Sequence, residues 1–327
     1  MRVLFIGGTG VTSWAAAEAA VRAGMDLTVV CRGKTGRPPP GGARVRMGDI
    51  RDSDWARSVL GRDTFDVVVQ WVGFVPGHVE LDLELFGGRV SQYVFISSAS
   101  VYDPSARLPI TESSPRGNPH WAYAREKIAC EERLFEAFRR DRFPVTVVRP
   151  SHTYDRARLP VRGGWTVVDR MRRGLPVVVA GRGGSLWTLT HHEDFARGLV
   201  GLVGLEAAVG QAVHVTSDEA LSWNEIYRTL AHAAGANLRA VHVPCEVIAS
   251  LDPEWGASLL GDKAVSKVFD NSKIKSLVPS YRATIPYERG AAMQVAWYDE
   301  DPARRAVDPR VNENIDRILA SPSARSI

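Results

Sequence analysis

The chain is poor in the residues that define several common protein classes. It has three cysteines, an odd number at wide spacing, so we expect neither a disulfide framework nor a zinc site. That cysteine usage fits a reducing cytoplasm, which is the compartment we predict. No apolar run approaches the roughly 18 residues that suggest a membrane span, so we expect no membrane partner.

A concentrated positive charge is also missing. The net charge is +4, and most basic residues are interspersed with acidic ones, so no polybasic patch or nucleic-acid tail stands out. Nucleic acid is therefore an unexpected partner. The sequence has no internal repeat and no low-complexity segment, and no Gly/Ser-rich stretch divides it, so we expect no flexible linker.

What the first 150 residues do contain is a regular alternation of short apolar runs and helical patterns. The predicted strands are residues 2–6, 26–31, 43–49, 65–72, 91–98 and 144–150. The predicted helices are residues 11–24, 53–61 (with Ser53 or Asp52 as its cap) and 121–140. Strands that alternate with helices imply a parallel sheet with right-handed crossovers. We therefore predict an α/β fold with a Rossmann-type doubly wound parallel sheet over residues 1–150.

The remaining residues, 151–327, give a less regular pattern. The predicted helices are residues 163–174, 192–203 and 222–235, and the predicted strands are residues 175–180 and 211–217. We expect this part to form mostly a smaller C-terminal α/β substrate lobe, partly interleaved with the first domain. Residues 205–327 carry no assignable motif and are expected to shape a substrate pocket.

A glycine-rich turn joins the first predicted strand to the first predicted helix. Gly7, Gly10 and Ser13 stand three residues apart, and Thr9 and Val11 complete the turn. Glycine permits a tight turn and lets the backbone approach a pyrophosphate, while the helix N-terminus offers free N–H groups. A structural loop and a signal peptide are the alternatives. The strand–turn–helix context favours a dinucleotide site.

The end of the second predicted strand indicates which dinucleotide binds. An acid there would bond the ribose 2′-hydroxyl of NAD, but the chain has Cys31 and then Arg32. Because Arg can pair with a 2′-phosphate, NADP is favoured over NAD; a solvated surface Arg is the alternative. Asp49 and Ile50 follow the third predicted strand and are expected to contact the adenine, although Asp49 could equally start a helix.

Tyr123 and Lys127 are four residues apart on a predicted helix, so they share one face. A free tyrosine, with a pKa near 10, is a poor base, and a neighbouring ammonium stabilises the phenolate. Lowering the pKa to about 7 requires roughly 4 kcal/mol, which one unit-charge pair at about 4 Å supplies at an effective dielectric near 20. Ser98 ends a predicted strand that would place its hydroxyl beside the same substrate oxygen. A core-facing aromatic is the alternative for Tyr123.

Seven motifs together resemble the extended short-chain dehydrogenase/reductase family, in its sugar epimerase and dehydratase branch. In order over about residues 1–205 they are GGTGVTS, GDIRD, VFISSASVY, PITESSP, YAREK, VTVVRPSHTYD and LTHHEDFA. The resemblance implies a catalytic set of Ser98, Tyr123 and Lys127, with Lys127 also contacting the cofactor. It further implies that Tyr123 takes a proton from a sugar hydroxyl while hydride leaves to the nicotinamide. The ketone is then re-reduced on its other face or used for elimination.

Two positions depart from this family's pattern in the expected substrate region. The family often has Arg where Trp187 stands and Asn where His152 stands, and both normally help to hold a nucleotide diphosphate. Losing the Arg removes a phosphate partner. Either the substrate lacks a diphosphate, with Trp187 as an apolar or stacking wall, or another basic residue such as Arg158 or Arg162 replaces it.

The residues after the catalytic serine depart as well. The 4,6-dehydratases usually carry an Asp-Glu pair there, whereas this chain has Ala99 and Ser100, the latter a candidate substrate contact. This favours epimerisation or simple redox chemistry, with His152 and Glu112 as candidate acid/base groups if the protein is a dehydratase. No metal is expected, because His191 and His192 lack a partner at ligand spacing.

The segment 74–90 is shorter than in the family and leaves room for little of the helix that usually forms its dimer. The sequence therefore leaves the oligomeric state open between a monomer and a dimer. In this shortening the chain resembles atypical members, including the chloroplast stem-loop RNA-binding proteins.

The predicted function is that of an NAD(P)-dependent enzyme that transiently oxidises a hydroxyl of a sugar, nucleoside or nucleotide-sugar, leading to epimerisation or dehydration. One alternative is an NADPH-dependent carbonyl reductase. Another is a non-catalytic dinucleotide- or RNA-binding protein. A pure binding protein has no need for Tyr123 beside Lys127, which favours catalysis.

Overall fold

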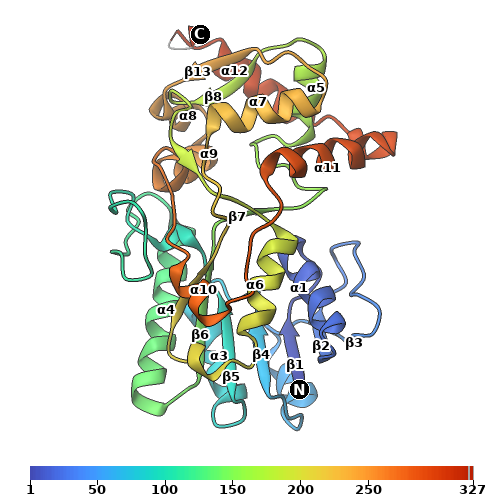
Figure 1. Cartoon of the computed structure of the whole chain (residues 1–327), viewed down its shortest axis with the longest axis vertical. Helices are drawn as coiled ribbons and strands as arrows, with labels where there is room; N and C mark the ends of the chain where they lie inside the picture. The colour runs from blue at the N-terminus through green and yellow to red at the C-terminus, as the bar shows by residue number, and fades with distance from the viewer. Residues whose placement is uncertain (323–324, 327) are drawn as a thin grey trace.

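The computed structural model describes residues 1–322 and 325–326, which form two lobes (Figure 1). The strands of the first lobe are β1 (Arg2–Ile6), β2 (Asp26–Cys31), β3 (Arg44–Met47), β4 (Val67–Gln70), β5 (Gln92–Ile96), β6 (Val145–Pro150) and β11 (Ala212–Val215). They form one seven-stranded sheet in the order β11-β6-β5-β4-β1-β2-β3, and every neighbouring pair is parallel. The predicted parallel α/β sheet is confirmed.

Helices cover both faces of this sheet, which explains why its strands read as continuous apolar runs. On one face lie α1 (Val11–Arg22), α6 (His192–Leu202) and α10 (Ser272–Leu277). On the other lie α2 (Ser53–Leu60), α3 (Pro76–Phe86) and α4 (Ala122–Asp141). Along β1 the side chains alternate between the two layers, with Val3 and Phe5 in one and Leu4 and Ile6 in the other.

The chain returns to this lobe after residue 150. The predicted strand at 211–217 becomes β11, which pairs with β6 at the edge of the first sheet, and α6 and α10 also pack there. The lobes are therefore not two successive stretches of sequence.

The segment 74–90 holds more helix than we expected. It forms α3, with 11 residues, which begins at Pro76 and packs against α4. Val79, Leu85 and Phe86 are buried in the layer that α3 shares with the sheet. Proline is favoured in the first turn because it has no N–H to leave unpaired there. Our expectation that the segment leaves little room for a helix is wrong.

The second lobe is smaller and mixed. Its sheet joins β8 (Val177–Ala180), β13 (Ala240–Val243) and β14 (Arg325–Ser326). Around it lie α5 (Trp165–Arg172), α7 (Trp223–Ala233), α8 (Cys245–Leu251), α9 (Pro253–Ser258), α11 (Tyr287–Asp299) and α12 (Pro309–Leu319). Ser222 caps α7 as predicted, in a capping box with Glu225.

Short elements join the lobes and complete the chain. Two strand pairs are β7 (His152–Tyr154) with β10 (Leu189–His191), and β9 (Leu186–Trp187) with β12 (Leu221–Ser222). The single turns of helix are η1 (Ala99–Val101), η2 (Glu206–Ala208), η3 (Leu259–Lys263) and η4 (Pro302–Arg305). Among the residues that the structure describes, no helix is both long and apolar enough to cross a membrane.

Candidate functional site

A cavity of about 680 Å³ lies at the carboxyl ends of the parallel strands and beside the start of α1. Open α/β sheets bind ligands at this edge, where the strand order reverses, here between β1 and β4. Several residues singled out in the sequence line this one cavity: Gly7, Thr9, Gly10, Val11, Arg32, Asp49, Ile50, Tyr123 and Lys127. The fold thus gathers the predicted cofactor residues around one space.

The turn between β1 and α1 has room for backbone only. Gly7 has φ +83°, and a Cβ there would lie 3.0 Å from Val72 Cγ1. A Cβ on Gly8 would lie 2.7 Å from Val29 Cγ1, so this glycine, which the sequence analysis passed over, is needed as well. Free N–H groups at the start of α1 face this turn. The cradle therefore fits the pyrophosphate of a dinucleotide.

Arg32 lies at the end of β2, where the ribose of a dinucleotide would bind. Its Nη1 is 3.5 Å from Asp49 Oδ2, and both side chains are largely exposed. An exposed ion pair of this kind contributes at most about 1 kcal/mol, so Arg32 can exchange Asp49 for a phosphate at little cost. Lys34 and Thr35 line the same part of the cavity and add donors for an anion.

Lys127 is held rigidly at the floor of the cavity. Its side chain is 1% exposed, and its Nζ donates to the carbonyl oxygens of Gly73 (2.7 Å) and Ile96 (2.8 Å). Burial lowers the pKa of Lys127 to about 8. An ammonium has three donors, so one remains for a ligand in the cavity that Lys127 lines.

Tyr123 shares the face of α4 with Lys127, but its electrostatics differ from our prediction. Burial raises the pKa of Tyr123 above its ordinary value, and hydrogen bonding with Ser98 opposes this only in part. The Lys127 Nζ lies 5.9 Å from the centre of the Tyr123 ring and is engaged by the two carbonyls. The expectation that Lys127 alone lowers the Tyr123 pKa is therefore wrong, and the phenol is a protonated donor in this arrangement.

Ser98 follows β5 and is oriented by its neighbour. Its Oγ accepts hydrogen bonds from the Ser100 N–H (3.1 Å) and the Ser100 hydroxyl (2.9 Å). With its two lone pairs occupied, Ser98 can only donate to a further group. Ser100 is buried, and neither Ser98 nor Ser100 is among the residues that line the two cavities. Ser100 holds Ser98 through these two hydrogen bonds, and contact of either serine with substrate stays a prediction.

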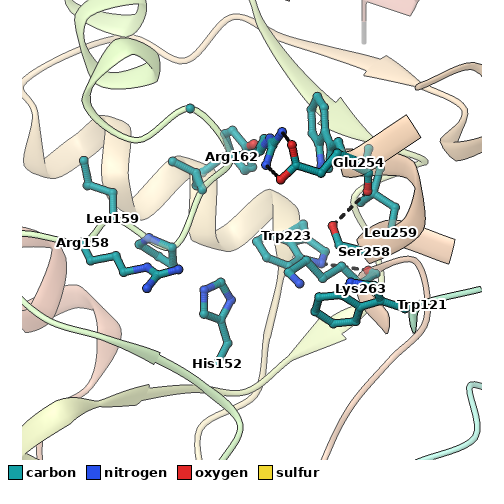
Figure 2. Close-up of a pocket in the computed structure, with 16 residues that line it drawn as sticks. Trp121, His152, Arg158, Leu159, Arg162, Trp223, Glu254, Ser258, Leu259 and Lys263 are labelled. Atoms are coloured by element: carbon teal, nitrogen blue, oxygen red, sulfur yellow. Dashed lines mark hydrogen bonds and ion pairs between the residues drawn. The ribbon is translucent and has the colours of Figure 1, made fainter. Parts of the chain in front are cut away.

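A second cavity, about 370 Å³ in volume, lies in the other lobe (Figure 2). Arg158 lines both cavities, so the two adjoin there. The aromatic residues on its wall are Trp121, Trp223, Tyr227 and Trp255, and the basic ones are Arg158, Arg162 and Lys263. Figure 2 shows Arg162 paired with Glu254, at 3.4 Å.

Trp187 lies behind this cavity rather than in its wall. Its indole is buried, stacks on Trp223 with ring centres 5.7 Å apart, and donates from Nε1 to His152 Nδ1 at 3.3 Å. The predicted stacking wall is instead supplied by Trp121 and Trp223. Trp187 therefore affects the cavity indirectly, by positioning Trp223 and His152, which line it.

The two candidate acid/base groups for a dehydratase do not suit that role. Burial, then Lys263 and Arg158, lower the pKa of His152 to about 3, so the ring is neutral at physiological pH. Glu112 lines neither cavity, and its Oε1 accepts the backbone N–H of His214 at 2.9 Å. Neither group is placed to carry a proton for elimination.

His191 and His192 serve the local fold through their Nδ1 atoms. His191 Nδ1 accepts the N–H of Glu193 at the start of α6, at 3.4 Å, and His192 Nδ1 lies 3.3 Å from the carbonyl oxygen of Val11. With the Glu193 carboxylate, these rings bring three ligand-type atoms within 4.8 Å of one another. The premise that the two histidines lack a partner at ligand spacing is therefore wrong, and their structural role stays a prediction.

Replacing His191 by Asn should make the protein less sensitive to acid. Burial lowers the pKa of His191 to about 3, so its stabilising contribution is present above the unfolded value of about 6.5 and is lost as pH falls toward 3. Asn keeps an acceptor for the Glu193 N–H but does not titrate. The free energy of unfolding, measured by urea at several pH values, should therefore fall less steeply, by up to roughly 1.4 kcal/mol per pH unit. The exposed His232→Asn is the control, and parallel curves for wild type and His191→Asn would refute this assignment.

A buried polar network behind the site was not predicted. Arg149 on β6 is 2% exposed and pairs with Glu131 on α4, which is fully buried, through contacts of 2.9 and 2.6 Å. The Ser97 hydroxyl donates to the same carboxylate, and Arg149 also donates to the Tyr102 hydroxyl at 2.7 Å. Glu131 follows Lys127 by four residues, and this spacing on one helix face was the available signal.

Comparison with known proteins agrees with this geometry. Residues 83–215 match the NAD dependent epimerase/dehydratase family. The match places this segment, which includes α4 and β6, in that family. The relatives of the chain include epimerases, dehydratases and a reductase, so the predicted enzyme of the extended short-chain dehydrogenase/reductase type is confirmed.

Three known proteins, two related in sequence and one in structure, illustrate what this chain is similar to. The chain is 27% identical to a 2′-dehydrokanamycin reductase of Streptomyces kanamyceticus, over 90% of this chain and 82% of that protein. It is 25% identical to the chloroplast stem-loop binding protein of 41 kDa b of Arabidopsis thaliana, over 72% of this chain and 63% of that protein. The structure of UDP-glucose 4-epimerase from Bifidobacterium longum, in complex with NAD+ and UDP, superposes with a TM-score of 0.73 at 20% identity, covering 92% of this chain and 99% of that one.

Proposed function

We propose that this protein is an NADP(H)-dependent enzyme that oxidises a hydroxyl of a sugar-like substrate to a ketone, with Tyr123 as the proton carrier. The observation that carries the proposal is that Tyr123 and Lys127 line the same cavity as the glycine-rich turn. A dinucleotide held by that turn supplies the hydride acceptor. Epimerisation, in which the ketone is re-reduced on its other face, is the outcome we favour.

The residues divide the work by their hydrogen-bonding capacity. Oxidation needs Tyr123 as the phenolate, so the bound dinucleotide and Lys127 would first have to lower the pKa that burial raises. The ionised Tyr123 would then accept the proton of the substrate hydroxyl during oxidation, and the phenol would return it to the carbonyl oxygen during reduction. Ser98 would orient this oxygen by turning its O–H from Tyr123 to the substrate, since its two lone pairs are taken by Ser100. The third donor of Lys127 holds the ribose hydroxyls and keeps positive charge near the phenol.

The second cavity is the proposed place for the rest of the substrate. It adjoins the first at Arg158, and its volume of about 370 Å³ suits a small metabolite of nucleoside or sugar size. Trp121 and Trp223 offer flat apolar faces on which a base or a sugar ring can stack. Arg158 and Lys263 line this cavity and would supply the cationic phosphate partners that Trp187 cannot.

A carbonyl reductase is the second candidate. The relative from Streptomyces kanamyceticus matches 90% of this chain and carries the name of a reductase. The two functions differ in how the dinucleotide is used: an epimerase regenerates it in place, whereas a reductase exchanges it at every turnover.

Identifying the nucleotide in freshly purified protein separates these candidates. The protein is denatured and the released nucleotide is identified by mass spectrometry. A stoichiometric amount of NADP would support the self-recycling epimerase, and an empty protein that binds NADPH on titration would support the reductase. A protein that binds no dinucleotide at all would contradict both.

Replacing Arg32 by Ala should weaken NADP binding selectively. A charge-assisted hydrogen bond contributes about 1.5–3 kcal/mol, so we expect the Kd for NADP to rise about 10- to 100-fold and the Kd for NAD to change less than about 3-fold. Titration calorimetry with both nucleotides measures this. Arg22→Ala, an exposed change on α1, is the control. Equal losses for the two nucleotides would remove Arg32 from the phosphate site.

A further inference from the structure

The contact between Trp187 and His152 fixes where the proton of the imidazole lies. Trp187 Nε1 is 3.3 Å from His152 Nδ1. An indole N–H can only donate, so His152 Nδ1 must accept. A neutral imidazole carries one proton, which must then be on Nε2. The Nε2 atom of His152 is therefore an N–H donor.

This donor is directed toward the second cavity. His152 lines the cavity, and Figure 2 shows its ring rising beside the Arg158 guanidinium. In the part of the chain that the structure describes, Nε2 makes no hydrogen bond, while Nδ1 is taken by Trp187. A protein donor facing an internal cavity without a partner is available to a ligand.

The indole is held in place from two sides. Trp187 is 4% exposed, and its ring stacks on Trp223 at an interplanar angle of 28°. The Lys263 Nζ lies 5.6 Å from the Trp187 ring and 5.2 Å from the Trp121 ring. Rotation of the indole would break these contacts, so the N–H stays aimed at His152.

The charges around His152 have one sign. Arg158 and Lys263 lower the pKa of His152 beyond the effect of burial, which shows that both cations act on the ring. Glu254, the acid on the cavity wall, is engaged by Arg162. The Lys263 Nζ also lies 3.8 Å from Oδ2 of the buried Asp262, which does not line the cavity. Among the described residues that line it, this corner therefore presents N–H donors and positive charge and lacks a free carboxylate.

We propose that Trp187 and His152 form a specificity pair: Trp187 holds the imidazole with its proton on Nε2, and that N–H donates to an anionic oxygen of the substrate. Arg158 and Lys263 complete the corner. The proposal takes from the proposed function only that this cavity receives the substrate. The corner formed by these residues would bind a molecule that bears a phosphate or carboxylate and would repel a molecule that bears ammonium groups.

The proton position can be measured directly on the full-length protein. Selective ¹⁵N labelling of histidine, read by long-range ¹H–¹⁵N correlation, distinguishes a bare Nδ1 from a protonated one. His152→Phe identifies the His152 signals among the eight histidines. We expect a bare Nδ1 and a protonated Nε2 in wild type, and a mixture of the two tautomers in Trp187→Phe, which keeps a ring but loses the N–H. A protonated Nδ1 in wild type, or unchanged signals in Trp187→Phe, would overturn the proposal.

The ligand preference is tested with two probes of opposite charge. UDP-glucose should shift the His152 Nε2 signal, and kanamycin, a polyamine, should leave it in place. Glucuronate, which has a carboxylate but no phosphate, is tested in place of UDP-glucose. A shift of the His152 Nε2 signal with glucuronate would show that a carboxylate is accepted, and a shift with UDP-glucose alone would show that a phosphate is required. Failure of both anionic probes to shift the signal would overturn the ligand assignment, whatever the activity of the enzyme.

A double-mutant cycle separates the donor from simple packing. Trp187→Phe should weaken binding of the responding probe about 10-fold, which is about 1.4 kcal/mol. In the His152→Phe background the same change should have no further effect, because the donor is already gone. An equal loss in both backgrounds would mean that Trp187 acts by packing, and would overturn the pair. Binding of NADP in the other cavity reports that each variant is folded.

Discussion

Replacing Tyr123 by Phe should lower kcat by about 10²- to 10⁴-fold and change the Kd for NADP by less than about 2-fold, because the substitution removes the hydroxyl that carries the proton and leaves the ring. The ring stays packed beside Trp121, whose centre lies 5.0 Å away, so the shape of the cavity is kept. Turnover is measured on a sugar substrate converted by the wild type, and NADP affinity by titration calorimetry.

Tyr227→Phe is the matched control for this prediction. Tyr227 lines the second cavity and loses the same hydroxyl, yet it has no proposed part in proton transfer. Its kcat should stay within about 3-fold of wild type. Retained turnover in Tyr123→Phe, or equal losses in the two variants, would refute the role of Tyr123.

The second large effect concerns stability. Replacing Glu131 by Gln should lower the free energy of unfolding by about 3–5 kcal/mol, because it leaves the Arg149 guanidinium buried without its counter-charge. Chemical denaturation monitored by circular dichroism measures the loss. Glu132→Gln, whose side chain is 62% exposed, should cost less than about 1 kcal/mol.

A double substitution shows whether charge is the cause. Replacing Glu131 by Leu and Arg149 by Met removes both charges and keeps much of the volume, so most of the stability lost in Glu131→Gln should return. The network joins α4 to β6 and to Ser97, which follows β5 and directly precedes Ser98. If Glu131→Gln were as stable as wild type, the pair would not hold these elements together.

The parallel sheet could be predicted because its signals are local. Strands buried on both faces require uninterrupted apolar runs such as residues 2–6, and helices between them force parallel pairing. The glycine-rich turn and the Tyr123–Lys127 spacing are likewise short patterns, and the fold brings them to one cavity. Local patterns could not place β11 in the sheet. Its pairing with β6 depends on contacts between residues about 65 apart in sequence.

The substrate side was harder to predict because it depends on burial. A tryptophan near a pocket was expected to line it, whereas Trp187 lies one layer back and Trp223 takes the wall. The predicted sign of the Tyr123 pKa shift was wrong for a related reason: the spacing shows the charge of Lys127, but it shows neither the desolvation of the phenol nor the two carbonyls that engage the ammonium. Both errors come from packing that no spacing rule encodes.

The central claim is that Tyr123 becomes an effective base only when the dinucleotide is bound beside it. The most direct measurement is the pKa of Tyr123, taken as the ultraviolet difference titration of wild type minus Tyr123→Phe, with and without NADP⁺. Without nucleotide, burial should keep the Tyr123 pKa above its ordinary value. With NADP⁺ bound, the nicotinamide cation and Lys127 should together bring that pKa below its ordinary value of about 10. A Tyr123 pKa that stays elevated in the complex would contradict the account.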